Sequence, residues 1–495
     1  MGAKKSLNPI GFLGLPVTII TSAVYIALAV ALLYTHHVVP SPSSNAPVKG
    51  VNISEAWHDL QVISEGFHPY NTKKNDVVRN WLLQRIDQIL VANKAEYSVQ
   101  GAKNAAFLGA SVATTSNGSS ASPVIVFNDL NSNGTWSAAG SNTSVYFEGN
   151  NIMVYIRGTR DGSTNWWMHS GDDEEEESAA PPSHGVLVNA HYDSVSTGFG
   201  ATDDGVGVIS VLQLIKYHTT PGNQPKRGLV ALLNNGEEDF LNGAKAFMRH
   251  PISRFPDTFL NLEGAGAGGR AVLFRSSDAE VTNAYTKSPY PFGSILSADF
   301  FKRRVIGSQT DYVVFEGELG IRGLDVAFFE PRSKYHTDND AARFTSKDSI
   351  WHMLSAAVAA TRDLTADTTT DFSRGQGHDG VWFDLLGRIF GLTQLHVMFA
   401  LSVTLLVVAP IIMLAMMFIL IKTDKYYLFA RKGKSDPLDP NSPDDEVIVS
   451  FNGWRGLFRY PVAFCLATAA VVGLAYLMTK INPYIVYSSQ YSVFR

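Results

Sequence analysis

Three long apolar segments constrain the fold most strongly, because each is long enough to cross the hydrocarbon core of a membrane. Backbone polar groups in that core must pair within the segment, so each segment is predicted to be a helix. We expect transmembrane helices over residues 11–34, 394–421 and 460–480. Small residues in the first segment would also suit cleavage of a secretory signal, but its apolar stretch exceeds a usual signal core. An uncleaved anchor is therefore the preferred interpretation.

Basic residues next to these segments predict how the chain crosses the membrane. Lys4 and Lys5 precede the first segment, and further basic residues lie between the second and the third: Lys422, Lys425, Arg431, Lys432, Lys434, Arg455 and Arg459. Flanks rich in lysine and arginine stay in the cytosol. We therefore expect a cytosolic N-terminus (1–10) and a cytosolic loop (422–459). We expect the long segment 35–393 and the C-terminal end 481–495 in the lumen.

Two further features fit a translocated domain. Sequons for N-glycosylation occur at Asn52, Asn117, Asn133 and Asn142. The single cysteine, Cys465, lies in the third apolar segment, so no disulfide is expected within the lumenal segment. A domain there must be stabilised by its own core or by metal ions.

The charge of the chain narrows the class of partner. A formal net charge of −5 argues against a nucleic-acid partner. The acidic run DDEEEE at 172–177 is predicted to be a solvated insert between strands, and a calcium site there is the less favoured alternative. The sequence does not define the oligomeric state.

The lumenal segment carries the pattern of an α/β fold. Residues 55–95 carry apolar residues at helical spacing, as in VVRNWLLQRIDQILVAN. The following alternating stretches read as strands joined by a turn near Gly149 and Asn150. From residue 186 onward, short apolar runs alternate with helical segments. This alternation predicts a mixed, largely parallel sheet flanked by helices, in a domain over about residues 50–372.

Polar residues follow four of the predicted strands, and one more lies in the loop after the first of them. These residues are His191, Asp203, Glu237, Glu238, Glu263 and His336. Sites in such sheets form at the carboxyl ends of strands. Each residue alone has an ordinary explanation, because carboxylates cap and stabilise helix starts and a lone histidine is usually structural. Two imidazoles with three or more carboxylates, however, match the ligands that zinc prefers and exceed the needs of one four-coordinate ion.

These residues lie in motifs that resemble a known family, the di-zinc aminopeptidases related to bacterial leucyl aminopeptidases and yeast aminopeptidase Y. The resemblance rests on AHYDSVSTGFGATDDGVG, NNGEEDFLNGAKAF, FLNLEGAG and YHTDND, which occur in the family's order over roughly residues 180–345. The order of an N-terminal span, a lumenal protease and further spans resembles the fungal vacuolar membrane proteases of that family. Those proteins continue into a longer multi-span half, so we expect this chain to be truncated at its C-terminal end.

The resemblance implies two zinc ions and a role for each residue. Five ligands are implied: His191 and Glu263 on one ion, Glu238 and His336 on the other, and Asp203 bridging both. The family often has aspartate where Glu263 stands. Glu237 is implied as the general base. Asp193 is implied as the support of His191, and a turn cap is the alternative for this residue.

The chemistry of such a site is consistent with peptide hydrolysis. A bridging carboxylate offsets the repulsion between two cations. The adjacent side chains of Glu237 and Glu238 diverge, so one can bind metal while the other reaches a metal-bridging water, whose pKa falls toward about 7. That neighbouring carboxylate can take the proton and deliver it to the leaving amine. Asp193 lies two residues after His191, on the same side of an extended chain, and can accept its second ring N–H.

We therefore expect a membrane-anchored zinc exopeptidase that acts on peptides at the lumenal side of the vacuolar membrane, with the endoplasmic reticulum as the alternative location. An aminopeptidase is the preferred assignment, and cleavage at the carboxyl terminus of the peptide stays open. Two other functions stay open: a protease-like receptor or scaffold without catalysis, and a single-zinc enzyme like the related glutaminyl cyclases. Four residues near the motifs carry weaker expectations. Asp204 is expected to cap the following helix, Asp340 to orient the last metal loop, and Asp311 and Tyr312 either to line the pocket or to form an ordinary loop.

Overall fold

The computed structural model describes residues 14–43, 47–101, 122–137, 143–162, 165–168, 185–375, 377–423, 430–433, 447–450 and 453–482. The chain forms two compact units, Met1–Leu395 and His396–Arg495. The sequons at Asn117 and Asn142 and the acidic run at 172–177 lie outside the described residues. Asn52 and Asn133 are described and exposed.

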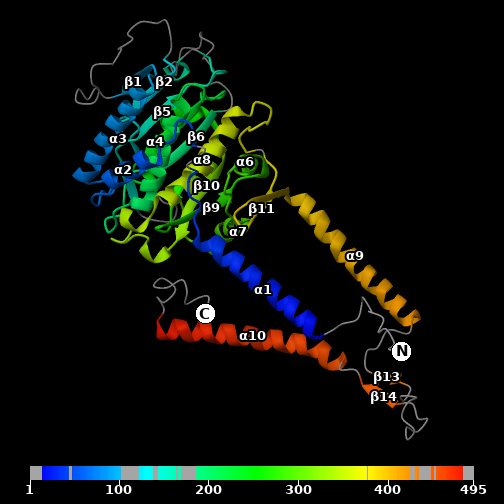
Figure 1. The fold of residues 1–495 in the computed structure, drawn as a ribbon. Coiled ribbons are helices and arrows are strands. Elements are labelled where there is room, and N and C mark those ends of the chain that lie inside the picture. Colours follow the sequence, from blue (N-terminus) through cyan, green and yellow to red (C-terminus); the bar gives the residue numbers. More distant parts are fainter. Residues whose placement is uncertain are drawn as a thin grey trace. The chain divides into compact units, whose positions relative to one another are not determined.

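The first unit is built on an eight-stranded sheet in the order β1–β2–β5–β7–β6–β8–β10–β9 (Figure 1). The strands span Tyr97–Gly101 (β1), Val124–Asn128 (β2), Ile152–Ile156 (β5), Gly185–His191 (β6), Leu229–Asn234 (β7), Pro256–Gly264 (β8), Gly268–Ser276 (β9) and Arg322–Glu330 (β10). The four neighbours β7, β6, β8 and β10 are parallel, whereas β5 and β9 run antiparallel to their neighbours. The predicted mixed, largely parallel sheet is confirmed.

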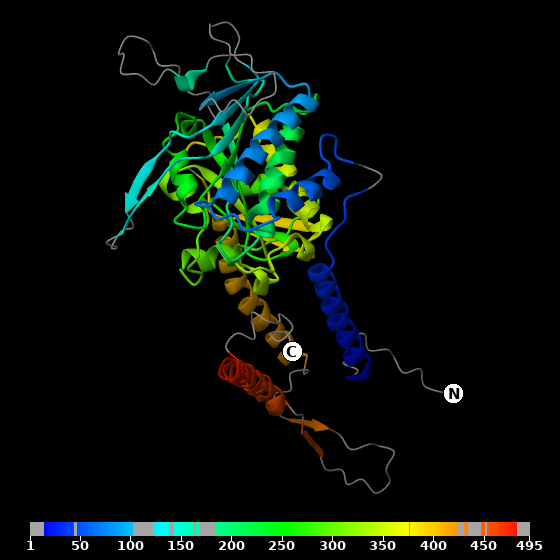
Figure 2. The same cartoon turned by 90° about the vertical axis from the view of Figure 1, so that its left-hand side faces the viewer.

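Apolar side chains from both faces of the sheet form two core clusters. One face is covered by α2 (Ile53–Ile63), α3 (Lys73–Ala92), α4 (Val206–Thr219), α6 (Ala279–Tyr285) and α8 (Lys347–Ala366), and the blue helices α2 and α3 lie in front in Figure 2. The other face is covered by α5 (Asn242–Phe247) and by aromatic residues such as Trp166 and Phe315. In β6, Val186 and Val188 pack on the first side and Leu187 on the second, which explains its continuous apolar sequence.

The elements around residues 77–156 follow the sequence pattern with one difference in pairing. The predicted helical pattern over 55–95 corresponds to two helices, α2 and α3. The two stretches on either side of Gly149 and Asn150 form β4 (Ser144–Phe147) and β5, as predicted, but they belong to different sheets. β4 pairs with β3 (Gly134–Ser137) in a separate hairpin, whereas β5 pairs with β2 and β7.

The described residues contain three helices that are long and apolar enough to cross a membrane, as predicted: Thr18–His37, Leu395–Lys422 and Val462–Ile481. They lie in α1 (Gly14–His37), α9 (Leu395–Lys422) and α10 (Gly453–Ile481). The first unit also contains α7 (Ile295–Lys302) and a hairpin of β11 (Gly380–Leu385) and β12 (Ile389–Gln394). The second unit contains a hairpin of β13 (Ala430–Gly433) and β14 (Val447–Ser450).

His218 makes the stability of the domain dependent on pH. It is buried in α4, its Nε2 lies 3.1 Å from Thr361 Oγ1, and burial lowers its pKa to about 4. An unfolded histidine titrates near 6.5, so between these pH values the unfolded chain binds a proton that the folded chain does not, and stability falls as the pH falls. The unfolding free energy of the unaltered chain falls between pH 7 and pH 5. In His218→Gln this fall is expected to be smaller by about 2 kcal/mol.

Urea denaturation of the detergent-solubilised chain, followed by tryptophan fluorescence at both pH values, measures this difference. His58→Gln is the control, because His58 is exposed on α2 and its replacement should leave the pH dependence unchanged. An unchanged pH dependence in His218→Gln would contradict the assignment of a buried, uncharged imidazole.

Candidate metal centre

The predicted site residues converge at the carboxyl ends of the four parallel strands. His191 ends β6, Glu263 is the penultimate residue of β8, and the other residues lie in the loops after β6, β7 and β10. From β6 the chain passes through α4 to β7 on one side, while β8 pairs with the other side of β6. The strand order therefore reverses at β6, and such a reversal opens a crevice at the carboxyl ends of the strands.

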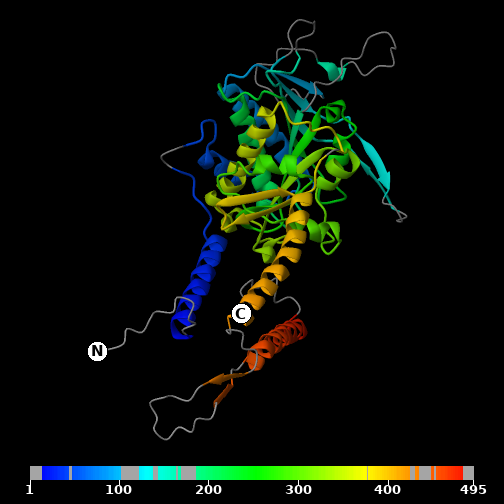
Figure 3. The same ribbon diagram turned by 90° about the vertical axis from the view of Figure 1, so that its right-hand side faces the viewer.

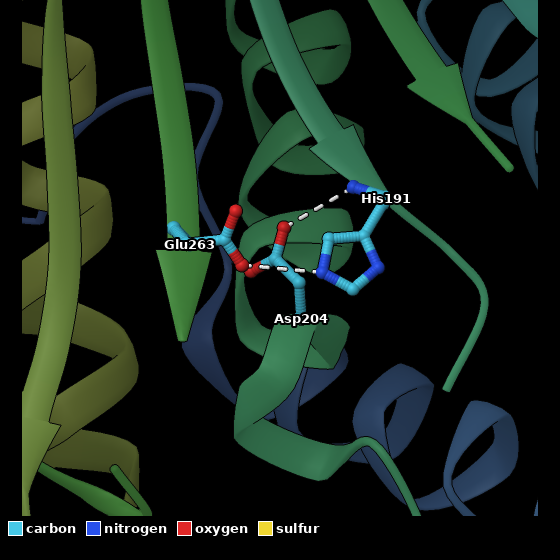
Figure 4. Close-up of side chains that lie close together, drawn as sticks. All are labelled: His191, Asp204 and Glu263. Atoms are coloured by element: carbon cyan, nitrogen blue, oxygen red, sulfur yellow. Dashed lines mark hydrogen bonds and ion pairs between the residues drawn. The ribbon is translucent and has the colours of Figure 1, made fainter. Parts of the chain in front are cut away.

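His191 is surrounded by carboxylates at the end of β6. Its Nε2 lies 3.1 Å from Glu263 Oε1, 3.4 Å from Asp203 Oδ1 and 4.0 Å from Glu237 Oε2. Figure 4 shows the His191 imidazole pointing toward Glu263. In the same view, Asp204 lies between these two residues. One imidazole nitrogen and several carboxylate oxygens thus face a common point.

His336 forms a second group with the same central carboxylate. Its Nε2 lies 3.1 Å from Asp203 Oδ2 and 3.1 Å from Glu238 Oε2. The ring of Tyr335 stacks on the His336 ring at a centroid distance of 3.6 Å, which fixes the orientation of the imidazole. The two oxygens of Asp203 therefore face two different histidines.

The loop that carries Asp203 is held by two further carboxylates. Asp340 accepts hydrogen bonds from the backbone N–H groups of Thr202 (2.9 Å) and Asp203 (3.1 Å), so it orients the loop of Asp203 as well as its own. Asp204 accepts from Gly207 N (3.1 Å) in the first turn of α4, as expected for a cap, and also from His191 N (3.2 Å). The Asp203–Asp204 peptide bond is cis.

Asp193 connects the strand that ends in His191 with the loop that carries the two glutamates. One carboxylate oxygen accepts from Glu237 N (3.2 Å) and the other from Glu238 N (3.3 Å). The Asp193 carboxylate lies 3.4 Å from His191 Nδ1, and the Asp193 carbonyl is closer, at 3.0 Å. Asp193 thus orients His191 mainly through its backbone and orients both glutamates through its side chain.

The electrostatics of the site reflect the burial of many carboxylates together. Burial raises the pKa of Glu237, and the neighbouring Glu263 raises it further. Burial and the nearby Asp203 likewise raise the pKa of Glu238. Burial alone would raise the pKa of Asp203, but the two histidines outweigh it and hold the pKa below its usual value. A site of this kind gains from bound cations, which offset the repulsion between the carboxylates.

The donor atoms fit zinc. Two buried carboxylate oxygens at the centre have no hydrogen-bond partner among the described residues: Glu238 Oε1 and Glu263 Oε2. Ligand atoms of His191, Asp203 and Glu238 lie within 4.8 Å of one another, as do those of His191, Asp204 and Glu263. Buried polar groups without partners are costly, and imidazole with carboxylate is a donor set that zinc accepts.

A layer of asparagines beneath the ligands escaped the sequence reasoning. The amides of Asn189 on β6 and Asn234 on β7 both donate to Asp311 Oδ2, at 2.9 and 2.5 Å. Asn189 also donates to Asn261 on β8 at 2.7 Å. Asn189 and Asn261 each stand two residues before a predicted ligand, in NAH and NLE. Side chains two apart in a strand lie on the same face, so this spacing was the available sign that the asparagines support the ligands. Asp311 is fully buried, so it supports the strand ends rather than lining a pocket.

Tyr312, unlike Asp311, lines a cavity of about 400 Å³ between α7, β9 and β11. The other residues around that cavity include Arg275, Phe301 and Trp382. None of the predicted site residues is among its lining residues, so this cavity is distinct from the candidate metal centre.

Comparison with known proteins gives a family for the segment that carries this site. Residues 175–361 match the model of peptidase family M28. The chain is 54% identical over 99% of its length to the vacuolar membrane protease of Aspergillus fumigatus, covering 49% of that protein. It is 54% identical over 98% of its length to the vacuolar membrane protease of Aspergillus niger, covering 48%. The chain therefore spans about half the length of the curated relatives it matches.

Among solved structures, the chain is similar to the LapA aminopeptidase of Legionella pneumophila, with 14% identity and a TM-score of 0.43 over 68% of this chain and 77% of that one. The family match covers the strands and loops that bring His191, Asp203, Glu238, Glu263 and His336 together. The chain therefore carries a peptidase family M28 domain over residues 175–361.

Proposed function

We propose that this protein is a zinc-dependent aminopeptidase that binds two zinc ions. His191 and Glu263 would hold one ion, Glu238 and His336 the other, and Asp203 both. The observation that carries the proposal is the position of Asp203, whose Oδ1 lies 3.4 Å from His191 Nε2 and whose Oδ2 lies 3.1 Å from His336 Nε2. A carboxylate with its oxygens toward two imidazoles is suited to bridge two cations and to offset their repulsion.

Glu237 is proposed as the general base. Zinc, when bound, lowers the pKa of water and polarises a substrate carbonyl. The Glu237 carboxylate is buried, faces the centre at 4.0 Å from His191 Nε2, and is the adjacent residue to a proposed ligand. It can take a proton from the attacking water and give it to the leaving amine. Asp193 keeps both glutamates in place through their backbone N–H groups.

The proposed location is the vacuolar membrane, with the peptidase domain in the lumen. The name of the curated relatives supports the vacuole, and three long apolar helices support membrane anchoring. The distribution of basic residues supports the lumenal side, as do the exposed sequons at Asn52 and Asn133, at which we expect N-glycans.

The decisive experiment measures zinc content and hydrolysis together on the purified full chain. Metal analysis should give near two zinc ions per chain, and aminoacyl-arylamides should be hydrolysed while their N-acetylated forms are not. Hydrolysis of N-acetylated peptides would contradict the aminopeptidase assignment. Zinc binding without turnover of any peptide would favour a scaffold, and one zinc ion per chain would favour a cyclase-like enzyme.

Asp193→Asn is expected to lower zinc affinity or kcat by about 10–100-fold, because outer-shell partners of metal ligands have effects of this size. The asparagine amide would present an N–H group to one of the two backbone donors of Glu237 and Glu238. Competition with a fluorescent zinc chelator, together with steady-state kinetics, measures both effects. Asp338→Asn is the control: Asp338 is exposed and accepts a hydrogen bond from the neighbouring Asn339 side chain at 2.9 Å, so this change should alter neither value.

A further inference from the structure

The hairpin β11–β12 and helix α7 expose large apolar side chains on the first unit. On the hairpin, Phe383, Leu385 and Ile389 are 49%, 55% and 63% exposed, and Leu385 pairs directly with Ile389 across the strands. On α7, Leu296 and Phe300 are 61% and 46% exposed. These two residues are four apart, so they lie on one side of the helix. Exposed large apolar side chains gathered on one region of a domain mark a candidate interaction site.

The hairpin and α7 are neighbours. Ser294, which precedes α7, forms an isolated β-bridge with Phe383. Asp384 N donates to Gly293 O at 2.9 Å, and Gly293 N donates to Asp384 Oδ1 at 3.0 Å. We define the hairpin–α7 face as the exposed apolar residues Leu296, Phe300, Phe383, Leu385, Leu386 and Ile389.

The C-terminal end of α1, a candidate membrane span, contacts the same hairpin. Thr35 Oγ1 donates to Leu386 O at 3.5 Å, and the guanidinium of Arg270 donates to Val38 O at 2.8 Å. Figure 3 shows the yellow strands of the hairpin above the end of the blue helix α1. The hairpin also leads directly into a second candidate span, because β12 ends at Gln394 and α9 begins at Leu395. One candidate span therefore contacts this hairpin, and a second follows the hairpin directly in sequence.

Basic residues flank the apolar side chains of α7. Lys302, Arg303 and Arg304 follow Phe300 in sequence and are exposed, and Val305 beside them is 68% exposed. Exposed cations next to apolar side chains are typical of segments that lie in a membrane interface, where the cations meet acidic headgroups and the apolar groups enter the acyl boundary.

We propose that the hairpin–α7 face contacts the lipid bilayer and inserts into its interface. The proposal rests on the membrane anchoring proposed above and is independent of the peptidase activity. The domain would then meet the membrane at three places: α1, the start of α9 and this face. Three points of attachment hold the peptidase domain in one orientation, whereas a tether alone would leave it free to rotate. His36 Nε2 lies 2.8 Å from Glu330 Oε2 at the carboxyl end of β10, and that strand leads to His336. Glu330, which contacts the C-terminal end of α1, and the candidate metal centre therefore lie at the same edge of the sheet.

The test uses the full chain with single cysteines, which is practical because Cys465 is the only native one. In a Cys465→Ser background, Phe300→Cys, Leu386→Cys and Ile389→Cys each receive a bimane label. Val91→Cys on α3, 53% exposed, is the aqueous control, and Val407→Cys within α9 is the membrane control. Each protein is reconstituted in phosphatidylcholine vesicles with and without lipids that carry a nitroxide, either near the headgroup for the interfacial positions or near the end of the acyl chain for the position within α9.

Labels at 300, 386 and 389 are expected to lose at least about half of their emission to the lipid nitroxide, because interfacial side chains enter the acyl boundary by roughly 5–10 Å. The label at 407 should be quenched and the label at 91 should not. Quenching at 407 without quenching at 300, 386 and 389 overturns the proposal. Absence of quenching at 407 overturns membrane anchoring and this proposal together, without touching the peptidase assignment. Quenching at the face only after acidic lipid is added overturns insertion in favour of a purely electrostatic contact.

Discussion

Glu237→Gln is expected to lower kcat for aminoacyl-arylamide hydrolysis by about 10²–10⁴-fold, the range for loss of a general base. Glutamine has nearly the same shape as glutamate, but it cannot accept the proton at pH 7. Glu237 is not one of the five proposed zinc ligands, so the variant should keep near two zinc ions per chain. KM should change little, because the carboxylate acts on the reacting water rather than on substrate binding. Steady-state kinetics with metal analysis of the same sample measures all three quantities.

A matched control separates this effect from a general change of charge. Glu65→Gln removes one carboxylate from an exposed position, where its side chain is 76% exposed and pairs only with a surface lysine. Its kcat should equal that of the unaltered chain. If Glu237→Gln retained more than a tenth of the original kcat with zinc in place, the general base would have to be another residue.

Asp203→Ala is expected to reduce zinc binding at both positions, because one side chain faces both histidine groups. Loss of the bridge leaves two cations without the carboxylate that offsets their repulsion, and it leaves each with fewer ligands. The loss in affinity should exceed the about 10–100-fold effect typical of an outer-shell partner. Zinc content after dialysis should fall below one ion per chain, and hydrolysis should fall with it.

The control variant for Asp203→Ala changes a residue in the loop of Asp340, which binds the backbone N–H groups of Thr202 and Asp203. Asp338→Ala removes an exposed carboxylate from the loop that carries His336 and Asp340, and it should retain both ions. Two tightly bound zinc ions in Asp203→Ala would refute the bridging role and would move the common ligand to another carboxylate, of which Asp204 is the nearest in sequence. Thermal unfolding with and without a chelator checks that Asp203→Ala is folded when its zinc content is measured.

Several features of this protein followed from local sequence because their physical cause is local. The length and apolarity of three segments were enough to predict helices, since backbone hydrogen bonds must close within each segment. The apolar runs before His191 and Glu263 predicted buried strands, and the change to polar residues marked the strand ends. The cap of α4 by Asp204 depends on residues three apart, and the sequence predicted it.

Features that depend on strand order were beyond the sequence pattern. The strands on either side of Gly149 and Asn150 were correctly predicted, yet their assignment to different sheets depends on which distant strands they meet. The asparagine layer beneath the candidate metal centre also depends on strand order. Asn189, Asn234 and Asp311 come from positions separated by as much as 122 residues, and they meet only because β6 and β7 are neighbours below the loop of Asp311.

By itself, then, the sequence determined three helices that are long and apolar enough to cross a membrane, the α/β class and the identity of the side chains available for a metal site. Each of these follows from residue type and spacing along one element. The tertiary structure alone decided that the two oxygens of Asp203 face two histidines and that Asp340, 137 residues away, holds the Asp203 N–H. The physical reason is that such contacts are made between elements, and their geometry is set by the packing order of the sheet rather than by any local preference of the chain.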